Sequence, residues 1–511
     1  MTFMPSDLRV LFLPKNSRHE FFSAVLHAAV ESLRWRVQVV CEPGAQKQWS
    51  KAIGASDFYS VPDFTKTQDW EGDEAAEREL DDFISDCERR SNMPVGHIVL
   101  AGERDLGRGF SEPAYYWFRN RISNLVLADN AQPYLIVRRM FAFARDALKA
   151  ASPDVVIGGE WADTLCFVTS LAARQMGIRC VVFRPSKLWS GRGYWTDDPL
   201  MYNSLAREAS VLRRQRGAEI SDRARTKIEK FRQSPTTLGY VQKNWDNDAA
   251  RGWLGYHVTL AKLMAVQLSH AVGLRKGPPP KPAFQIAWDH YRRPFLKYLQ
   301  RGFFQRFDQK DLASRRYVFL ALHKDPEQAL NYQAPFWSNQ INTVAFLSAL
   351  LPVGYSLLVR EHRLNTGRRP TDYYRQLRHL PGVVLIDAFD SQFKYIANAD
   401  LVVTDNGSTG WEALMLGRGV MTVAPHFFEG AGLDRRVFDL EKIPATVLEL
   451  LNQPCVPDGN YDRKLGWLLD AEWETTTPMQ PIDPAEMFGQ LQEVLSDTPA
   501  DQDMVRNRFS A

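Results

Sequence analysis

The sequence predicts an α/β fold in which two doubly wound, Rossmann-like domains face a cleft and a helical insert lies between them. Three observations predict it. Short apolar segments alternate with helical patterns in two stretches of the chain, residues 1–205 and 312–455. From about 206 to 311 the pattern changes to helices alone. The length of 511 residues also exceeds that of one ordinary core, which favours several domains.

In the first domain, expected strands and expected helices follow one another along the chain. The expected strands are Leu8–Leu13, Val37–Cys41, His97–Ala101, Asp154–Ile157 and Arg179–Arg184. The expected helices cover about 21–33, 74–90, 119–150 and 163–176. Residues 43–73 are rich in Gly, Pro and Trp, so we expect them to be irregular.

In the second domain, four short apolar segments each run into polar or charged residues. They are Tyr317–Leu322, Ser356–Val359, Val383–Ile386 and Leu401–Thr404. Helical patterns separate them, so the strands should be parallel, with their carboxyl ends on one edge of the sheet. Ligands of open α/β sheets bind along that edge. The remaining tail, about 456–511, should be helical, with its last helix near 484–496.

The strongest functional signal follows the fourth of these strands, in the sequence Asn406-Gly-Ser-Thr-Gly-Trp-Glu412. Small residues let a phosphate approach the backbone, hydroxyls donate to it, and the start of a helix attracts its charge. We therefore expect Asn406, Gly407, Ser408, Thr409 and Gly410 to bind a phosphate, and Glu412 to bind a ribose or base. The alternative is an ordinary helix start that Ser408 or Thr409 caps.

Two other strand ends carry residues that suit the same ligand. His323, Lys324 and Glu327 follow the first strand of the second domain, and Arg360 and His362 follow the second strand. Histidine can donate to or protonate a leaving phosphate, and lysine or arginine can neutralise it. The alternative is that each histidine is a satisfied structural residue and that the cations are solvated rim charges.

Two carboxylates in the first domain are candidates for the catalytic group, together with His362. Glu160 and Asp163 close the strand Asp154–Ile157, in the sequence Gly158-Gly-Glu-Trp-Ala-Asp163. A carboxylate at a strand end can act as a general base or a nucleophile. The alternative is helix capping, for which Asp163 is well placed.

Composition excludes several other classes of function. The net charge of +3 argues against nucleic acid as the main ligand. Five scattered cysteines without CxxC spacing indicate neither a disulfide framework nor a zinc site. Asp246-Asn-Asp248 lies in a polar turn before a helix, where capping is the better interpretation, so no metal is predicted.

The aromatic and basic run from Trp288 to Phe304 leaves two interpretations open. It could lie on an anionic membrane surface or grip an acidic polymer. It could equally be a packed helix with a solvated basic face.

Four segments resemble the bacterial capsular polysaccharide biosynthesis family, which includes transferases that add Kdo from its CMP-activated form. They are His323–Gln328, Leu358–His362, Ile396–Leu414 and Gly417–Val420. The resemblance implies a metal-independent GT-B glycosyltransferase that binds the donor nucleotide in its second domain and the acceptor in its first. It also implies that His362 contacts the donor phosphate, although Arg363 stands where related enzymes have a proline, and that Ser408 and Thr409 do the same.

We therefore expect a cytoplasmic glycosyltransferase of surface polysaccharide synthesis. Its substrates would be a nucleotide-sugar, with a CMP-sugar favoured, and a glycan or glycolipid acceptor. No separate cofactor and no nucleic acid are expected, and peripheral contact with the inner membrane or with capsule assembly machinery is left open. The alternatives are a polyol-phosphate transferase or UDP-sugar 2-epimerase on the same scaffold, and a non-catalytic assembly protein.

Overall fold

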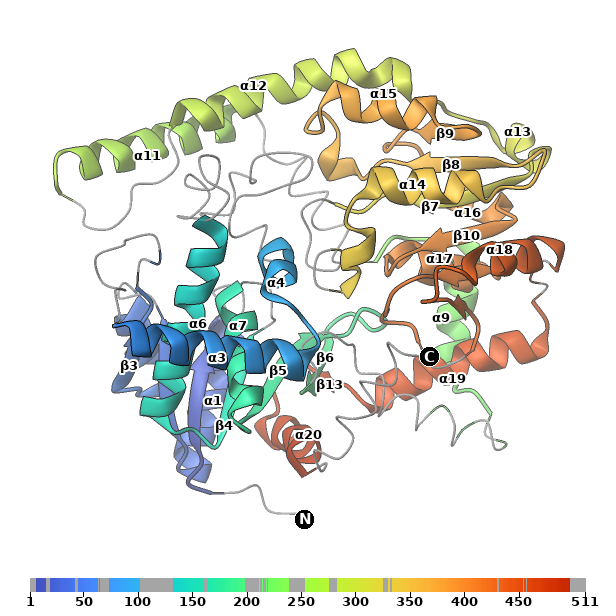
Figure 1. Ribbon diagram of the computed structural model, residues 1–511. Helices are drawn as coiled ribbons and strands as arrows, with labels where there is room; N and C mark the ends of the chain where they lie inside the picture. The colour runs from blue at the N-terminus through green and yellow to red at the C-terminus, as the bar shows by residue number, and fades with distance from the viewer. Residues whose placement is uncertain are drawn as a thin grey trace. The chain divides into compact units, whose positions relative to one another are not determined.

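The structure is a computed structural model, drawn in Figure 1, and its described parts form two compact units with one sheet each. It describes residues 6–14, 19–41, 45–62, 64, 73–101, 132–159, 164–197, 211, 214, 217, 219–238, 253–274, 283–324, 330, 333–429, 432–453, 455 and 457–496. The prediction of two Rossmann-like α/β domains is confirmed by the topology of these sheets. The predicted cleft between them stays a prediction.

The first unit is built on a seven-stranded sheet with the order β13-β6-β5-β4-β1-β2-β3. Its strands are β1 (Arg9–Leu13), β2 (Arg36–Cys41), β3 (Asp57–Ser60), β4 (Val155–Gly159), β5 (Arg179–Pro185), β6 (Arg192–Thr196) and β13 (Thr477–Pro478). The five strands β3-β2-β1-β4-β5 are parallel and have the order of a doubly wound nucleotide-binding sheet. The last two strands of the row, β6 and β13, pair antiparallel.

Helices of the first unit pack on this sheet through apolar faces. They are α1 (His19–Leu33), α2 (Gln46–Ile53), α3 (Glu74–Ser91), α4 (Val95–Ala101), α6 (Gln132–Ala151), α7 (Thr164–Gln175) and α20 (Pro484–Ser496). One buried cluster joins α1, α2 and α20 to the strands; there the ring of Phe21 stacks on that of Phe183, with centroids 4.3 Å apart.

One expected strand of this unit is wrong. His97–Ala101 was predicted as a strand, but the segment lies in helix α4, whose first turn closes when the amides of His97 and Ile98 donate to Pro94 O. A run of four apolar residues fits a buried helix as well as a strand, and periodicity cannot separate them. The third parallel strand is instead Asp57–Ser60, a short, polar edge strand inside the region predicted to be irregular.

The second unit is built on a six-stranded sheet with the order β12-β11-β10-β7-β8-β9, and every pair in it is parallel. Its strands are β7 (Tyr317–Ala321), β8 (Ser356–Arg360), β9 (Val383–Ile386), β10 (Leu401–Thr404), β11 (Val420–Thr422) and β12 (Arg435–Arg436). In chain order this is 6-5-4-1-2-3, the full doubly wound order. The four expected strands of this domain are confirmed to within a residue or so.

Helices of the second unit cover the sheet and extend beyond it (Figure 1). They are α9 (Asp222–Gln233), α11 (Trp253–Ala271), α12 (Ala283–Gln300), η3 (Arg301–Phe303), α13 (Gln309–Ala313), η5 (Pro335–Trp337), α14 (Gln340–Ala349), η6 (Arg363–Asn365), α15 (Thr371–His379), α16 (Gln392–Asn398), α17 (Ser408–Met415), α18 (Ile443–Asn452) and α19 (Gly459–Glu474). The first three come from the predicted helical insert. By its contacts this insert belongs to the second unit.

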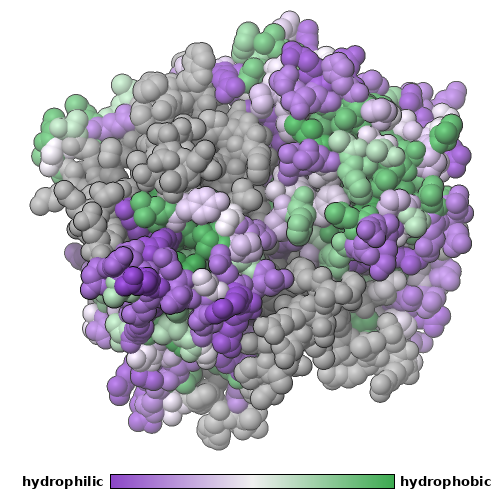
Figure 2. All heavy atoms as spheres, viewed as in Figure 1, coloured by the Kyte–Doolittle hydropathy of each residue, from purple (hydrophilic) through white to green (hydrophobic). Residues whose placement is uncertain are grey.

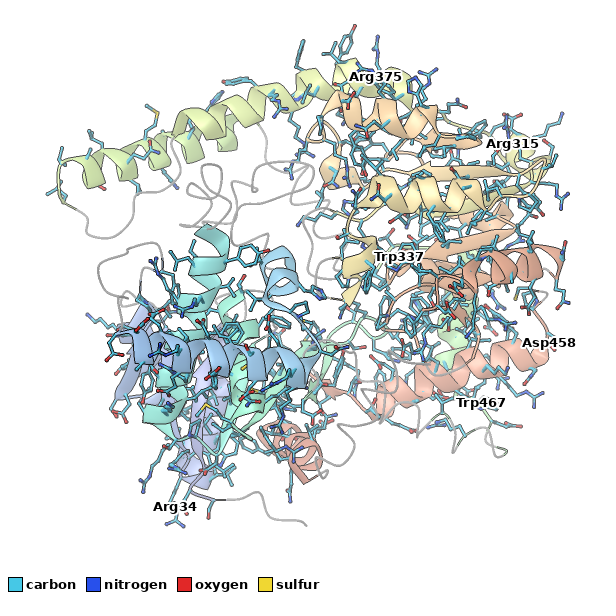
Figure 3. All side chains as sticks on the ribbon, in the orientation of Figure 1. Arg34, Arg315, Trp337, Arg375, Asp458 and Trp467 are labelled. Carbon is cyan, nitrogen blue, oxygen red and sulfur yellow. The ribbon has the colours of Figure 1, made fainter. Side chains whose placement is uncertain are left out.

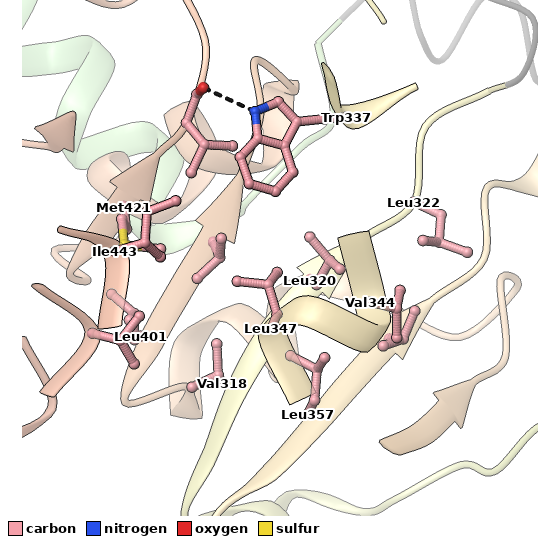
Figure 4. Packing of buried hydrophobic residues seen from close by; sticks show 14 of the residues in the cluster. Val318, Leu320, Leu322, Trp337, Val344, Leu347, Leu357, Leu401, Met421 and Ile443 are labelled. Atoms are coloured by element: carbon pink, nitrogen blue, oxygen red, sulfur yellow. Dashed lines mark hydrogen bonds between the residues drawn. The ribbon is translucent and has the colours of Figure 1, made fainter. Parts of the chain in front are cut away.

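The core beneath α14 fixes the carboxyl edge of this sheet (Figure 4). Val318 and Leu320 of β7, Leu357 of β8 and Leu401 of β10 pack together with Val344 and Leu347 of α14. Trp337 closes the cluster at the strand ends, where its indole N–H donates to Val423 O at 3.1 Å. Figure 3 shows the same indole among the described side chains of the unit. Strands that are fully buried in this way hold their ends in fixed positions.

The C-terminal helix α20 should contribute to the stability of the first unit, because Met487 and Leu491 are fully buried in its core. Leu491→Ala is expected to lower the free energy of unfolding by about 2–5 kcal/mol. Urea denaturation measures this, with Glu486→Ala on the exposed face of the same helix as the control. A cost for Leu491→Ala no larger than the control's would contradict the packing of α20.

Candidate functional site

The candidate site lies at the carboxyl ends of β7 and β10. These strands are neighbours in the sheet, but the chain continues from β7 towards β8 on one side and from β10 towards β11 on the other. Such a reversal of strand order leaves a crevice outside the strand ends, where ligands of doubly wound sheets bind. The structure brings His323, which follows β7, and the Asp405–Gly410 segment, which follows β10, to this point.

The backbone of His323 is held by three side chains from two other segments. Its N–H donates to Gln340 Oε1 at 2.7 Å, and its carbonyl accepts from Asn365 Nδ2 at 3.2 Å and from an Arg369 Nη at 3.1 Å. Arg369 in turn forms a fully buried ion pair with Glu361 at 3.0 Å. Because both its amide and its carbonyl are bound, His323 cannot shift without breaking buried polar contacts.

The side chain of His323 is paired with a carboxylate. Its Nε2 contacts Oδ1 of Asp405, and only about a tenth of either side chain is exposed. Asp405 Oδ1 also accepts the backbone N–H of Asn406 at 2.9 Å. A carboxylate next to an imidazole orients the ring and stabilises its protonated form. Asp405 therefore fixes the orientation of the His323 ring at the switch point.

Gly407 separates this pair from the start of α17. Its backbone N–H donates to Thr404 Oγ1 at 3.0 Å, and a Cβ added to it would come within 3.3 Å of His323 Nε2. A larger residue would therefore crowd the histidine. The glycine lets the α17 backbone and the His323 ring approach one another, as expected for a phosphate-binding turn.

The start of α17 supports the phosphate interpretation over the capping one. Gly407 is the N-cap residue, and no described side chain caps the helix. Ser408 and Thr409 are therefore the first two residues of the helix, and their hydroxyls do not cap it. An eight-residue helix that starts without a capping side chain directs its first N–H groups and its dipole towards the switch point.

Gly410 has a packing role that the sequence did not indicate. A Cβ there would meet Phe428 Cζ at 2.6 Å and Thr404 Cγ2 at 2.8 Å. Phe428 belongs to the loop after β11, where its ring centroid lies 4.0 Å from that of the buried His426.

His426 Nε2 lies 3.1 Å from Asp434. Burial acts to lower the pKa of His426, but Asp434 and Glu429 outweigh it and raise that pKa above its usual value.

His362 lies at the matching place on the next strand. The register pairs Ala321 of β7 with Arg360 of β8. His323 and His362 therefore stand at equivalent positions, each two residues after its member of this pair. His362 Nδ1 accepts the backbone N–H of Leu364 at 3.2 Å and caps the short helix η6. A ring nitrogen that accepts is unprotonated, so the proton of the neutral imidazole is on Nε2. His362 thus has a structural contact at one nitrogen and a donor at the other.

Arg360 and Glu412 lie inside the protein, joined by Gln392. Arg360 donates to Gln392 Oε1 at 3.0 Å and to the carbonyls of Ala388 and Asp390 at 2.6 and 3.2 Å, and Gln392 Nε2 donates to Glu412 Oε2 at 2.5 Å. Burial lowers the pKa of Arg360 to about 10 and raises that of Glu412 to about 8, although Arg360 and Gln392 act to lower the latter. We do not place the ligand on either side chain, and their predicted contacts with it stay predictions.

The other predicted residues are placed as follows. Lys324 follows His323 and is half-buried, and Asn406 is buried with its Nδ2 donating to Gln333 Oε1 at 3.2 Å. Glu160, Asp163 and Glu327 lie outside the described residues, and so does Asp246–Asp248. Their predicted roles stay predictions.

Sequence reasoning missed the residues that position His323. Asp405, Gln340, Asn365, Arg369 and Glu361 come from four separate segments, and Tyr374 adds a hydrogen bond from its hydroxyl to Glu361 Oε2 at 2.8 Å. Asp405 carried a usable signal, because it is the first charged residue after β10. The others lie in loops and helices whose position depends on the folded chain, so residue spacing alone did not indicate them.

Comparisons with known proteins find similar folds at low sequence identity. No family model matches the sequence, and no curated protein does so with significance. Among solved structures, KpsC, a beta Kdo 2,4 transferase from Thermosulfurimonas dismutans, is 14% identical over 61% of this chain and 79% of its own, with a TM-score of 0.32. UDP-GlcNAc 2-epimerase from Methanocaldococcus jannaschii, in complex with UDP-GlcNAc and UDP, is 12% identical over 90% and 99%, with a TM-score of 0.27. Spinosyn rhamnosyltransferase SpnG is 13% identical over 92% and 98%, with a TM-score of 0.25. The functional argument below rests on this chain's own residues.

The buried carboxyl of Glu412 should make stability depend on pH. Its folded-state pKa of about 8 lies above the usual 4.5, so its contribution is fully present below about pH 4.5 and is lost as the pH rises through about 8. Glu412→Gln keeps the shape and removes the titration. The variant should gain stability relative to the wild type by on the order of a few kcal/mol between about pH 5 and pH 8. Urea denaturation across that range measures it, and parallel profiles for the two proteins would contradict it.

Proposed function

We propose that the protein is a glycosyltransferase that moves a sugar from a nucleotide-activated donor to a glycan or glycolipid, in the synthesis of a bacterial surface polysaccharide. One observation carries the proposal. The start of α17, which no described side chain caps, lies beside the His323–Asp405 pair at the point where the strand order of a doubly wound sheet reverses. A helix start beside a fixed imidazole at a switch point is suited to an anionic nucleotide.

In the proposed site, the donor phosphate lies against the first turn of α17. The N–H groups of Ser408 and Thr409 donate to it, and their hydroxyls, which do not cap the helix, add further donors. His323 faces the same turn across Gly407, with Asp405 fixing its ring. Lys324, the next residue in the chain, adds a cation.

These groups act on the step in which the bond between the sugar and the phosphate breaks. Negative charge builds up on the departing phosphate, and donors already in place stabilise it without reorganising. The hydrogen bonds on the His323 backbone keep the imidazole in position during this step. His362, with its Nε2 proton, is the second donor that we assign to the phosphate.

The finer assignment rests on the sequence resemblance to capsule transferases that use CMP-activated Kdo. We propose a CMP-sugar as the donor, with the first domain holding the acceptor and Glu160 or Asp163 acting as the base that receives the acceptor's proton. We propose no metal in the reaction, because cationic and N–H groups of the protein offset the phosphate charge at the site.

Ser408→Ala should lower kcat/KM by roughly tenfold to a hundredfold, because it removes a donor to a phosphate that gains charge in the transition state. His323→Ala should do the same, because it removes the imidazole that faces this turn. Steady-state kinetics measure both, and melting curves confirm that the variants are folded. Ser391→Ala is the matched control. This serine also stands at the start of a helix of the second unit, α16, makes no capping hydrogen bond through its side chain and is exposed. Full activity in both site variants would contradict the site.

Analysis of the products separates the proposed reaction from its alternatives. A glycosyltransferase consumes the nucleotide-sugar and the acceptor together and releases the nucleotide. A 2-epimerase converts UDP-GlcNAc without any acceptor, and a polyol-phosphate transferase releases CMP from a CDP-activated polyol. Either of these two results, or nucleotide binding without any product, would overturn the proposed reaction. None of them would contradict the proposed binding site.

A further inference from the structure

The face that α11 presents to solvent is apolar. Its exposed described residues include Ala261, Met264, Ala265 and Leu268, which lie along one side of the helix, and Val272 directly follows its end. Met264, Leu268 and Val272 are each between 57% and 65% exposed. An amphipathic helix of a soluble domain normally turns such a stripe inward, so this arrangement is the reverse of the usual one.

Helix α12 carries a second exposed stripe, which is aromatic. Tyr291, Phe295 and Tyr298 recur at spacings of four and three residues and are each between 56% and 61% exposed. Basic groups stand beside them, since the Arg301 guanidinium lies over the Tyr298 ring at 4.1 Å and the Lys297 ammonium over the exposed Phe389 ring at 3.7 Å. Aromatic rings that alternate with cations are typical of the polar boundary of a membrane.

The C-terminal half of α12 is fixed to the second unit. Arg293 Nε donates to Thr366 O at 3.1 Å, and Gln300 Nε2 donates to Arg369 O at 2.9 Å. Gly367, at a φ of 73°, approaches Arg293 so closely that an added Cβ would lie 2.3 Å from its carbonyl oxygen. α11 packs against α12, and Figure 2 shows hydrophobic side chains at the upper margin, where Figure 1 draws α12. The stripes are therefore held on a rigid base.

The charge of this segment differs sharply from that of the rest of the chain. Residues 249–307 contain ten Lys or Arg and one acidic residue, Asp289, which gives them a formal charge of +9. Because the whole chain carries +3, the remaining residues carry −6. An almost neutral protein thus carries a local excess of positive charge in the segment that contains two helices with exposed apolar stripes. Such a segment is attracted to an anionic surface.

We propose that α11 and α12 dock the protein on an anionic lipid surface. The apolar stripes enter the boundary between headgroups and acyl chains, and Lys262, Lys297 and Arg301 contact the headgroup phosphates. No described helix is long and apolar enough to cross a membrane, so the binding is interfacial. This docking surface does not depend on the nucleotide-sugar assignment.

The apolar stripes favour lipid over the other occupants. An acidic polymer would be bound by the cations alone and would leave Met264, Leu268 and Phe295 in water. A second copy of this chain would bring two segments of formal charge +9 together, and like charges repel across such a contact. A lipid surface satisfies both the apolar and the basic parts of the face at once.

Sedimentation with vesicles tests the docking surface, using the full chain with phosphatidylcholine alone and with phosphatidylglycerol added. The wild type should bind the anionic vesicles, and less well as salt rises. Met264→Ser combined with Leu268→Ser should weaken binding by about tenfold or more, as should Lys262→Glu combined with Lys297→Glu. Nucleotide binding by the same preparations should not change, so this proposal and the proposed function can fail separately.

Matched controls lie elsewhere on the second unit. Leu440→Ser with Leu448→Ser removes two exposed leucines, and Lys230→Glu with Lys310→Glu reverses two exposed lysines. Both controls should bind vesicles as the wild type does. The proposal is overturned if the wild type binds neither vesicle, or if the stripe variants and the controls lose binding equally. It is also overturned if binding to a soluble polyanion, heparin, equals vesicle binding and ignores the serine substitutions, or if those substitutions only turn an oligomer into a monomer in light scattering.

Discussion

The candidate site depends on one set of buried hydrogen bonds, those on the backbone of His323. A strand that ends in a sheet edge leaves its next residues free to move unless their amides and carbonyls are bound. Here Gln340, Asn365 and Arg369 bind both groups of His323, and the ion pair between Arg369 and Glu361 holds the arginine in place. The imidazole is thereby fixed opposite Gly407, and the geometry of the proposed phosphate site follows from it.

Burial divides the polar residues near the candidate site into two groups with different tasks. Arg360, Glu361, Arg369 and Glu412 are all less than a twentieth exposed and contact protein groups. They set the shape of the loops at the sheet edge. His323, His362 and Ser408 are only partly buried and lie where the strands and α17 meet the edge. We assign ligand contacts to this second group, because a side chain with a remaining exposed surface can reach a ligand.

The sequence alone predicted most of the alternation of strands and helices, including the helix that follows the strand Leu401–Thr404. Buried parallel strands appear in a sequence as short apolar runs. The Gly-Ser-Thr-Gly turn can also be recognised from local sequence alone, because small residues at a helix start suit an anion. The edge strand Asp57–Ser60 was missed because its polar residues carry no apolar pattern, and His97–Ala101 was misassigned because its apolar run fits either element. Arg360 and Glu412 were predicted as ligand contacts from their places near strand ends. The structure buries both side chains, which the sequence did not show, and their contacts with a ligand stay predictions.

We propose that the start of α17 binds the phosphate of a nucleotide. A negative charge placed at this helix start is the most direct test. Melting of the wild type and of Ser408→Asp would be compared without ligand and with CMP, UDP, GDP or CDP. An aspartate in the first turn interacts favourably with the helix dipole, so it does not destabilise the helix, but its charge repels a phosphate. At a hundredfold its dissociation constant, a nucleotide should stabilise the wild type by about 2.7 kcal/mol. We predict that CMP gives this shift and that Ser408→Asp keeps its own stability but loses the shift. A shift of equal size in both proteins, or none with any nucleotide, would contradict the account.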